Sequence, residues 1–156
     1  MFNEQQAEAS FGSDAAFGIL FEDQQGKRYT LEEGRAMLAS RSGPELSSIF
    51  PDGSSAITCT NYARHVAAAL PDRARIVGFF VEDNPASRLA QIAGGHDFAI
   101  VDDRWIVDPW VRLVECESGR ICFDLASPAD RAIVEDLYGP QERWIDAEQP
   151  EQNDPA

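Results

Sequence analysis

The segment GGHDFAIVDDRWIVDPW at positions 94–110 constrains the fold more than any other part of the chain. It holds two apolar runs of strand length on either side of the polar turn Asp102–Arg104. Strands with so short a connection pair antiparallel, and residues that face each other then have position numbers with a constant sum. His96 and Asp108 are both even-numbered, so they share a face only where that sum is even. The sequence therefore predicts an odd-length loop, or a bulge, between residues 100 and 105.

The alternation of side chains along these strands also predicts what surrounds the two polar residues. The other side chains expected on the shared face are apolar: Phe98, Ile100, Ile106 and Trp110. We therefore expect His96 and Asp108 to lie at the edge of a core face.

The rest of the chain alternates between helix and strand patterns. Strands are expected at 17–22, 75–82, 96–101 and 105–110, and a further hairpin at 111–116 and 120–125. Helices are expected from the Thr30–Glu33 capping box for about ten residues, from Ala56 to Leu70 after a cap at Ser54 or Ser55, from Asn84–Pro85 through Ile92, and from Ser127 to Gly139–Pro140. Helices followed by an antiparallel sheet indicate an α+β domain.

The length of 156 residues fits one domain with one core, and a hydrophobic content of 44% is enough to fill it. Residues 1–14 are polar and small, and are expected to be a disordered N-terminus. Residues 15–144 are expected to form a single catalytic domain. Residues 145–156 are acidic and rich in Gln and Pro, which favours a disordered tail.

The balance of acidic and basic residues limits the classes of partner that the chain can bind. Lys and Arg number 13 against 27 Asp and Glu, a net charge of −14, which argues against nucleic acids and anionic membranes. No apolar run approaches the roughly 20 residues of a membrane span, and residues 1–14 lack the basic and apolar regions of a Sec signal peptide. We expect a cytoplasmic protein, or one exported by a system that reads no such signal.

The chain has three cysteines, and reduced thiols are the default for a chain too long to need disulfide staples. Cys116 and Cys122 flank Gly119 symmetrically and could face each other across a hairpin, so a disulfide between them remains an alternative to two buried thiols. There is no CxxC pair, and the two histidines lack ligand-like spacing, so neither metal nor cofactor is expected.

Cys59 is the candidate nucleophile because it is predicted in the first turn of a helix. Unpaired backbone N–H groups and the helix dipole favour an anion there, lower a thiol's pKa and can hold the oxyanion of an acyl intermediate. His96 follows Gly94–Gly95 at an open strand end, and a buried Asp108 beside it would hold its tautomer. Each residue alone also fits a structural role, so the hypothesis depends on the combination.

The run HDFAIVDDRWIVDPW, with SAITCTNYA around Cys59, resembles the papain-like and transglutaminase-like superfamily of cysteine enzymes. The similarity covers residues 55–110 and is greatest to transglutaminase-like domains and bacterial papain-like toxins, some of which are glutamine deamidases and some proteases. It implies N-terminal helices packed on an antiparallel sheet, with Cys59 as nucleophile, His96 as base and Asp108 as orienting residue.

The chain departs from papain itself, because no Gln shortly precedes Cys59 and the Cys-Gly/Ser-Cys-Trp signature is missing. The oxyanion partner of the Cys59 backbone N–H is therefore open. The candidates for oxyanion or substrate binding are Asn61, Thr58, Ser54 or Ser55, and Trp110. Trp105 could also wall the site, whereas His65, Asp97, Asp102 and Asp103 are expected at the surface.

These expectations converge on a thiol-dependent acyl-transfer enzyme that acts on a protein amide. A glutamine side chain would give deamidation, interception by a lysine would give transglutamination, and a backbone amide would give proteolysis. An effector or toxin role follows by analogy. The alternatives are a peptidoglycan amidase of the NlpC/P60 or CHAP kind, and a non-catalytic binding domain with the same fold.

Overall fold

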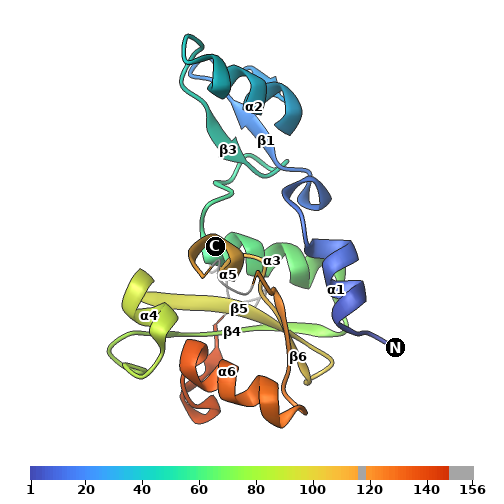
Figure 1. Cartoon of the computed structure of the whole chain (residues 1–156), viewed down its shortest axis with the longest axis vertical. Helices are drawn as coiled ribbons and strands as arrows, with labels where there is room; N and C mark the ends of the chain where they lie inside the picture. The colour runs from blue at the N-terminus through green and yellow to red at the C-terminus, as the bar shows by residue number, and fades with distance from the viewer. Residues whose placement is uncertain (116–118, 148–156) are drawn as a thin grey trace, which may run out of the picture.

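The computed structural model describes residues 1–115 and 119–147, which form an α+β fold (Figure 1). The helices are α1 (Glu4–Phe11), α2 (Leu31–Ser40), α3 (Cys59–Ala69), α4 (Arg88–Ala93), α5 (Val111–Val114) and α6 (Pro128–Tyr138), with short 3₁₀ helices at Asp14–Phe17 and Gln141–Arg143. The strands are β1 (Leu20–Glu22), β2 (Arg28–Tyr29), β3 (Ser47–Ile49), β4 (Ala74–Phe80), β5 (Gly95–Val101), β6 (Trp105–Val107), β7 (Cys122–Asp124) and β8 (Ile145–Asp146).

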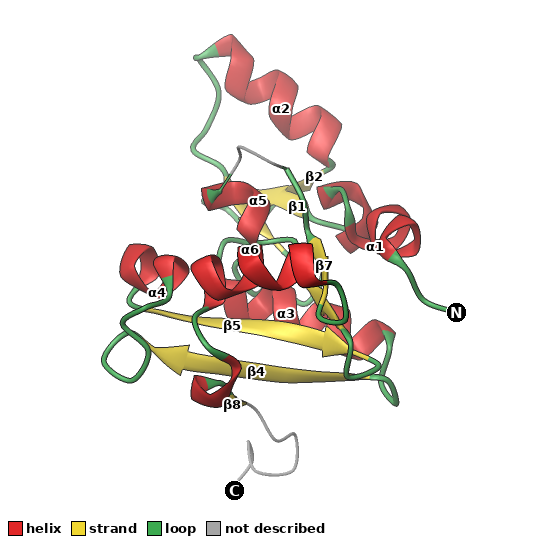
Figure 2. Ribbon diagram, turned by 60° about the horizontal axis from the view of Figure 1, so that its bottom comes forward, coloured by secondary structure: helices red, strands yellow, loops and turns green. Residues whose placement is uncertain are grey.

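The larger sheet is antiparallel, with the strand order β7-β6-β5-β4-β8. Figure 2 shows its two long central strands, β4 and β5, with the short strand β8 beside β4. In the β5–β6 hairpin Val101 pairs with Trp105 and Ile100 with Ile106, so facing positions have an even sum. The loop is the predicted three-residue turn, in which Asp102 and Asp103 adopt positive φ angles of 55° and 53°, a conformation that Asp tolerates better than most residues.

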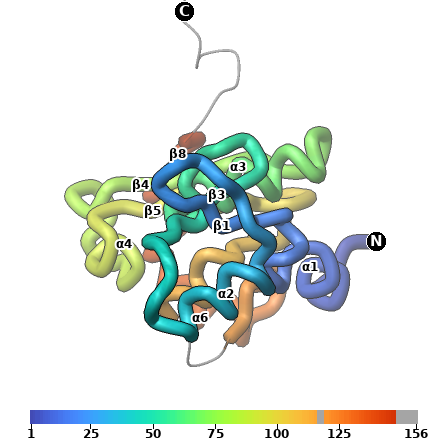
Figure 3. Tube along the Cα trace, turned by 90° about the horizontal axis from the view of Figure 1, so that it is seen from above, coloured from blue at the N-terminus to red at the C-terminus, as the bar shows by residue number. Residues whose placement is uncertain are grey.

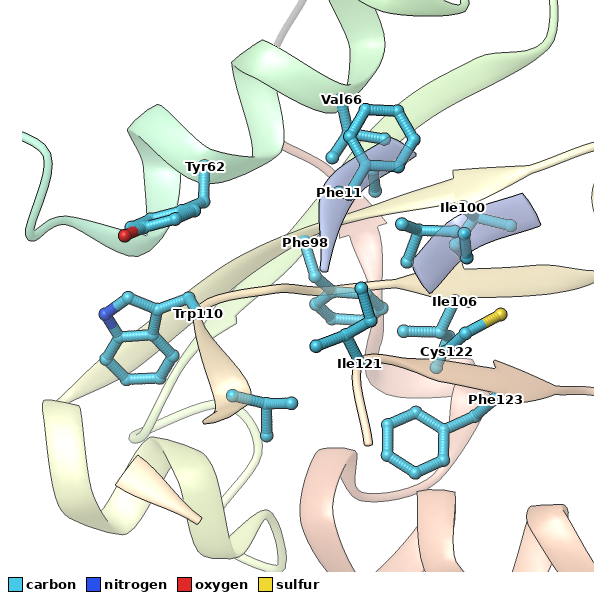
Figure 4. Close-up of a cluster of buried hydrophobic side chains, with 14 of the residues drawn as sticks. Phe11, Tyr62, Val66, Phe98, Ile100, Ile106, Trp110, Ile121, Cys122 and Phe123 are labelled. Atoms are coloured by element: carbon cyan, nitrogen blue, oxygen red, sulfur yellow. The ribbon is translucent and has the colours of Figure 1, made fainter. Parts of the chain in front are cut away.

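The core lies where helices cover this sheet. Helix α3 lies against β5 and β4, α6 contacts β7 and α4, and α1 contacts β7. Figure 4 shows Tyr62 and Val66 reaching from α3 toward the sheet, whose buried side chains include Phe98, Ile106 and Phe123. Tyr62 and Val66 are spaced by four positions, so one apolar face of α3 is anchored and its N-terminus is fixed relative to β5.

A smaller antiparallel sheet, β2-β1-β3, carries α2 and projects from one end of the molecule (Figure 1). Seen from above, this lobe lies over the body that holds the larger sheet (Figure 3). Helix α2 begins at the predicted capping box, in which Thr30 and Glu33 bond reciprocally. Gly34 lets α2 approach β1, because a Cβ there would lie 1.9 Å from the ring of Phe21.

Several boundaries differ from those predicted. Residues 1–14, expected to be disordered, include α1, because Ala7 and Phe11 are buried in the core and Asn3 caps the helix. Residues 111–116 were expected to form a strand, but 111–114 form α5, and β7 pairs with β6 instead. The expected strand 17–22 is shortened to β1 by the 3₁₀ helix before it.

Helix α3 also begins later than expected. Its N-cap is Thr58, not Ser54 or Ser55, and Cys59 is its first residue. The proposed Cys116–Cys122 pairing and most of the acidic tail lie outside the described residues. Within the described part of the chain, no helix is both long and apolar enough to cross a membrane.

Candidate active site

Cys59 is held at the start of α3 with two unpaired backbone donors beside it. Thr58 caps the helix by accepting a hydrogen bond from the backbone N–H of Asn61 (3.3 Å). Within the described residues the backbone N–H groups of Cys59 and Thr60 have no acceptor. These are the unpaired donors of a helix N-terminus, and such donors can stabilise a negatively charged oxygen.

The side chains of His96 and Asp108 are in contact, which the even sum of facing positions in the β5–β6 hairpin allows. Nε2 of His96 lies 2.6 Å from Oδ2 of Asp108, and both side chains are buried. An ionised carboxylate only accepts hydrogen bonds, so Nε2 carries the hydrogen and Nδ1 is left for another partner. The backbone N–H of Asp108 donates to the carbonyl of Ile121 (2.7 Å), which ties the end of β6 to the start of β7 and fixes the carboxylate.

The His96 ring is enclosed by aromatic side chains. Its centroid lies 4.8 Å from that of Trp110, 5.5 Å from that of Phe98 and 5.8 Å from that of Tyr138. The indole N–H of Trp110 donates to the carbonyl of Ile57 (3.1 Å), two residues before the nucleophile. Trp110 thus covers the imidazole and also ties the loop before α3 to the hairpin that carries His96.

The thiol of Cys59 and the imidazole of His96 shift each other's titration. Burial opposes ionisation of the half-buried Cys59, but the neighbouring His96 side chain, its charge and the Asp97 backbone N–H together lower the pKa of the thiol. Burial also opposes protonation of His96, but the charge and hydrogen bond of Asp108, with a smaller contribution from Cys59, raise its pKa to about 9. The arrangement favours a thiolate–imidazolium pair.

The thiol and the imidazole do not form a hydrogen bond of good geometry with each other. Nδ1 of His96 is buried and has no hydrogen-bond partner of good geometry in the described part of the chain, although the thiol is close enough to affect its pKa. The Cys59 sulfur accepts a hydrogen bond from the backbone N–H of Asp97 at 3.5 Å. Catalytic hydrogen bonds are commonly long in ligand-free sites and tighten when substrate binds.

Cys59 opens onto a cleft of about 430 Å³. Its lining comes from the start of α3, from β4 and β5, from the end of α4 and from β8: Cys59, Thr60, Gly78, Phe79, Phe80, Ala93, Gly94, Gly95, His96, Asp97, Ile145, Asp146 and Ala147. Of the glycines in this lining, Gly94 has nothing within 4 Å of the place where a Cβ would lie, which leaves room for a substrate backbone in the cleft. The cleft can therefore take an extended segment of chain as well as a small amide.

The side chains proposed for oxyanion or substrate binding do not converge on this cleft. Thr58 is occupied as the helix cap, and the Asn61 side chain donates to the carbonyl of Ser55 on the loop before α3. Asn61 and Ser54 line a different hollow, of about 390 Å³, beside His65. Trp110 covers the imidazole. The backbone N–H groups of Cys59 and Thr60 are the better oxyanion donors.

Other polar residues differ from the surface placement that the sequence suggested. His65 is half-buried and lies 4.4 Å from Phe17 and 5.7 Å from Phe50, ring centre to ring centre, because it follows one face of α3. Asp97 is half-buried in the cleft. Asp102 and Asp103 are exposed as expected, and they pair with Arg73 and Arg75.

Two residues of the site carried no sequence signal. Tyr138, at the end of α6, is fully buried and donates its hydroxyl to Oδ2 of Asp108 (2.8 Å). Gly78 lies inside β4 directly beneath Asp97. In the sequence, a tyrosine before Gly139–Pro140 indicates only the end of a helix, and a glycine within an apolar strand indicates only a bulge. The proximity of both residues to His96 becomes visible only in the fold.

The cysteines differ sharply in environment. Burial, together with the charge of Glu4, raises the pKa of Cys122 to about 12, which makes it an inert core thiol. No group of three or more His, Cys, Asp or Glu side chains in the described residues is arranged to hold a metal ion.

Comparisons with protein-family models, curated proteins and solved structures each gave no match to this chain. The assignment of function therefore depends on the geometry of the site.

Proposed function

We propose that this protein is a cysteine acyl-transfer enzyme that hydrolyses an amide of a protein substrate. The observation that carries the proposal is the juxtaposition of a helix-start thiol of lowered pKa, Cys59, with a buried imidazole, His96, whose far nitrogen contacts the buried carboxylate of Asp108. The base thus lies between the nucleophile and the orienting group, as nucleophilic catalysis by a triad requires.

The chemistry would proceed in two steps. The Cys59 thiolate attacks the amide carbonyl carbon, and the negative oxygen that forms is held by the backbone N–H groups of Cys59 and Thr60. Imidazolium His96 gives its Nδ1 proton to the amide nitrogen as the C–N bond breaks, which leaves a thioester and a free amine. Water then gives a proton to His96 and attacks the thioester, so the C–S bond breaks and the acid leaves with the ion pair restored.

Two features support a papain-like or transglutaminase-like framework and the choice of substrate. Cys, His and Asp occur in that order on a helix, a strand and the end of the adjacent strand, as in that superfamily. Within it, the resemblance of the HDFAIVDDRWIVDPW run to bacterial papain-like toxins favours a glutamine side chain as the amide. Ammonia then leaves and glutamate is formed, and the protein would act as a delivered effector or in the cytoplasm.

The test is product analysis with a matched control. Cell-lysate proteins are incubated with the wild type, with Cys59→Ala and with Cys122→Ala, and are examined by mass spectrometry. Conversion of Gln to Glu at defined sites indicates deamidation, Gln–Lys cross-links indicate transglutamination, and new termini indicate proteolysis. We expect the products with wild type and Cys122→Ala but not with Cys59→Ala. The proposal is wrong if Cys59→Ala gives the same products as wild type, or if no preparation gives any.

A further inference from the structure

The carboxylate of Asp97 is held in the cleft beside the nucleophile. Thr60, the second residue of α3, donates its hydroxyl to Oδ2 of Asp97 (2.7 Å), while the backbone N–H of Asp97 contacts the Cys59 sulfur. The other oxygen lies over Gly78, where a Cβ would be 2.1 Å from Oδ1. A side chain larger than hydrogen at position 78 would displace the carboxylate. The hydroxyl of Thr60 and the absence of a side chain on Gly78 therefore together fix the position of the carboxylate.

This carboxylate acts against the thiolate, since its charge is one of the influences that raise the pKa of Cys59. A negative group beside a nucleophile that must itself be negative is a cost to the chemistry. Asp97 also forms no ion pair with a Lys or Arg side chain of the described residues, unlike Asp102 and Asp103 on the hairpin loop nearby. Its charge is available to a ligand.

The described residues that line the rest of the cleft also lack side chains that would neutralise a carboxylate. Apart from the imidazole of His96, the described side chains in its lining include no basic group, and the second carboxylate there, Asp146, is paired with Arg75 at 3.3 Å. Two large apolar side chains are exposed at the cleft, Phe80 at 67% and Ile145 at 61%. An acidic group next to the thiol and an apolar rim suit a segment that is both basic and apolar.

We propose that Asp97 is a specificity-determining residue that selects substrates with a positively charged group next to the reacting amide, in a protein segment whose apolar side chains pack on Phe80 and Ile145. The inference rests on the proposed acyl-transfer function and names its substrate class. The overall charge of −14 acts in the same direction, because it draws basic partners to the surface.

Alkylation of Cys59 tests the charge selectivity without any amide substrate. The rates of reaction with 2-bromoethylamine (cationic), iodoacetamide (neutral) and iodoacetate (anionic) are measured by mass mapping of the Cys59 peptide. The ratio of each charged reagent to iodoacetamide cancels any change in the fraction of thiolate. Asp97→Asn should lower the bromoethylamine ratio about fivefold and raise the iodoacetate ratio similarly, as expected for one charge a few ångströms away in a site open to water.

Asp146→Asn is the matched control, because it removes the same charge from the same cleft but from an ion pair. Its ratios should stay within about twofold of the wild type. Unchanged ratios in Asp97→Asn, or an equal change in Asp146→Asn, would overturn the assignment to Asp97. Thr60→Val, which releases the carboxylate but keeps its charge, should give ratios between those of wild type and Asp97→Asn.

Peptide substrates then separate this inference from the proposed function. Glutamine peptides with Lys or with Glu beside the Gln are compared, and Asp97→Asn should reduce the preference for the Lys peptide through KM rather than kcat. Charge-selective alkylation without turnover of any amide would mean that the acyl-transfer proposal is wrong while the cationic site stands. Turnover with no Lys preference would mean the reverse.

Discussion

Tyr138 and His96 contact the same oxygen of Asp108, at 2.8 Å and 2.6 Å, from two different elements: the end of α6 and the start of β5. The tyrosine hydroxyl stays protonated, because burial and the charge of Asp108 raise its pKa well above the usual range. The buried Asp108 side chain is thereby held by two donors, and its orientation does not depend on His96 alone.

Removal of the tyrosine hydroxyl tests this arrangement. Tyr138→Phe keeps the ring, whose centroid is 4.6 Å from that of Phe98, but takes one donor from a buried carboxylate. We expect a loss of about 1.5–3 kcal/mol in the free energy of unfolding, the range for a hydrogen bond to a charged group, measured by urea denaturation. Tyr62→Phe, which removes a longer bond to Asp14 (3.4 Å), is the control and should lose less.

Asp108→Asn tests the orientation of the imidazole. An amide can donate as well as accept at this position, so the tautomer of His96 with hydrogen on Nε2 is no longer enforced. We expect amide hydrolysis to fall by a factor of about 10⁴ while the circular dichroism spectrum is retained. Near-normal activity would move the orienting role elsewhere, and the structure leaves few choices, since Asp103 is exposed and paired with Arg75.

The pH dependence of activity follows from the two shifted groups. Activity needs the thiolate of Cys59 and the proton of His96 together. The acid limb should therefore lie below the ordinary pKa of a thiol, which is about 8.5, because the pKa of Cys59 is lowered. The alkaline limb should lie near 9, where His96 loses its proton. In Asp108→Asn the residual activity should lose its alkaline limb at lower pH, because the carboxylate is the main cause of the raised pKa. A rate that rises steadily past pH 10 would contradict the imidazolium role.

The sequence predicted the hairpin and the meeting of His96 with Asp108 because both depend on local rules. Alternation fixes which residues share a face, and an Asp-Asp-Arg turn can adopt the positive φ angles that a three-residue loop needs. The same local rules placed the start of α3 near Cys59, although its cap is Thr58 and not Ser54 or Ser55.

What the sequence could not predict depends on contacts between distant segments. Residues 1–14 have a composition typical of disorder, yet Phe11 is buried and Arg112 donates to Glu8 and to the carbonyl of Gly12. Likewise, residues 111–114 are apolar enough for a strand, but β6 ends at Val107 and the chain turns over residues 108–110 into α5. Tyr138 and Asp97 acquire their roles in the same way, through neighbours far away in the chain.

Gly78 offers a test of how closely β4 and β5 must approach beneath the nucleophile. In Gly78→Ala the new Cβ would lie 2.1 Å from Oδ1 of Asp97 and 2.7 Å from the backbone carbonyl oxygen of His96. The side chain can rotate away, but the backbone of a central strand cannot move without shifting His96. We expect a loss of about 1–3 kcal/mol in the free energy of unfolding, and slower alkylation of Cys59 at neutral pH because the imidazole is displaced.

The double variant Gly78→Ala/Asp97→Ala separates the two clashes. It removes the contact with the Asp97 carboxylate but leaves the one with the His96 carbonyl, so stability should recover only in part. Loss of the Asp97 charge itself lowers the pKa of Cys59, so the reference is Asp97→Ala, and Cys59 should be alkylated more slowly than in that single variant. Gly43→Ala is the control, because a Cβ there meets nothing nearer than 3.5 Å, and it should leave both quantities close to wild type. Cys59 reactivity in the double variant equal to that of Asp97→Ala would mean that Gly78 serves only to make room for Asp97. It would also show that the strand spacing beneath His96 does not control the thiolate.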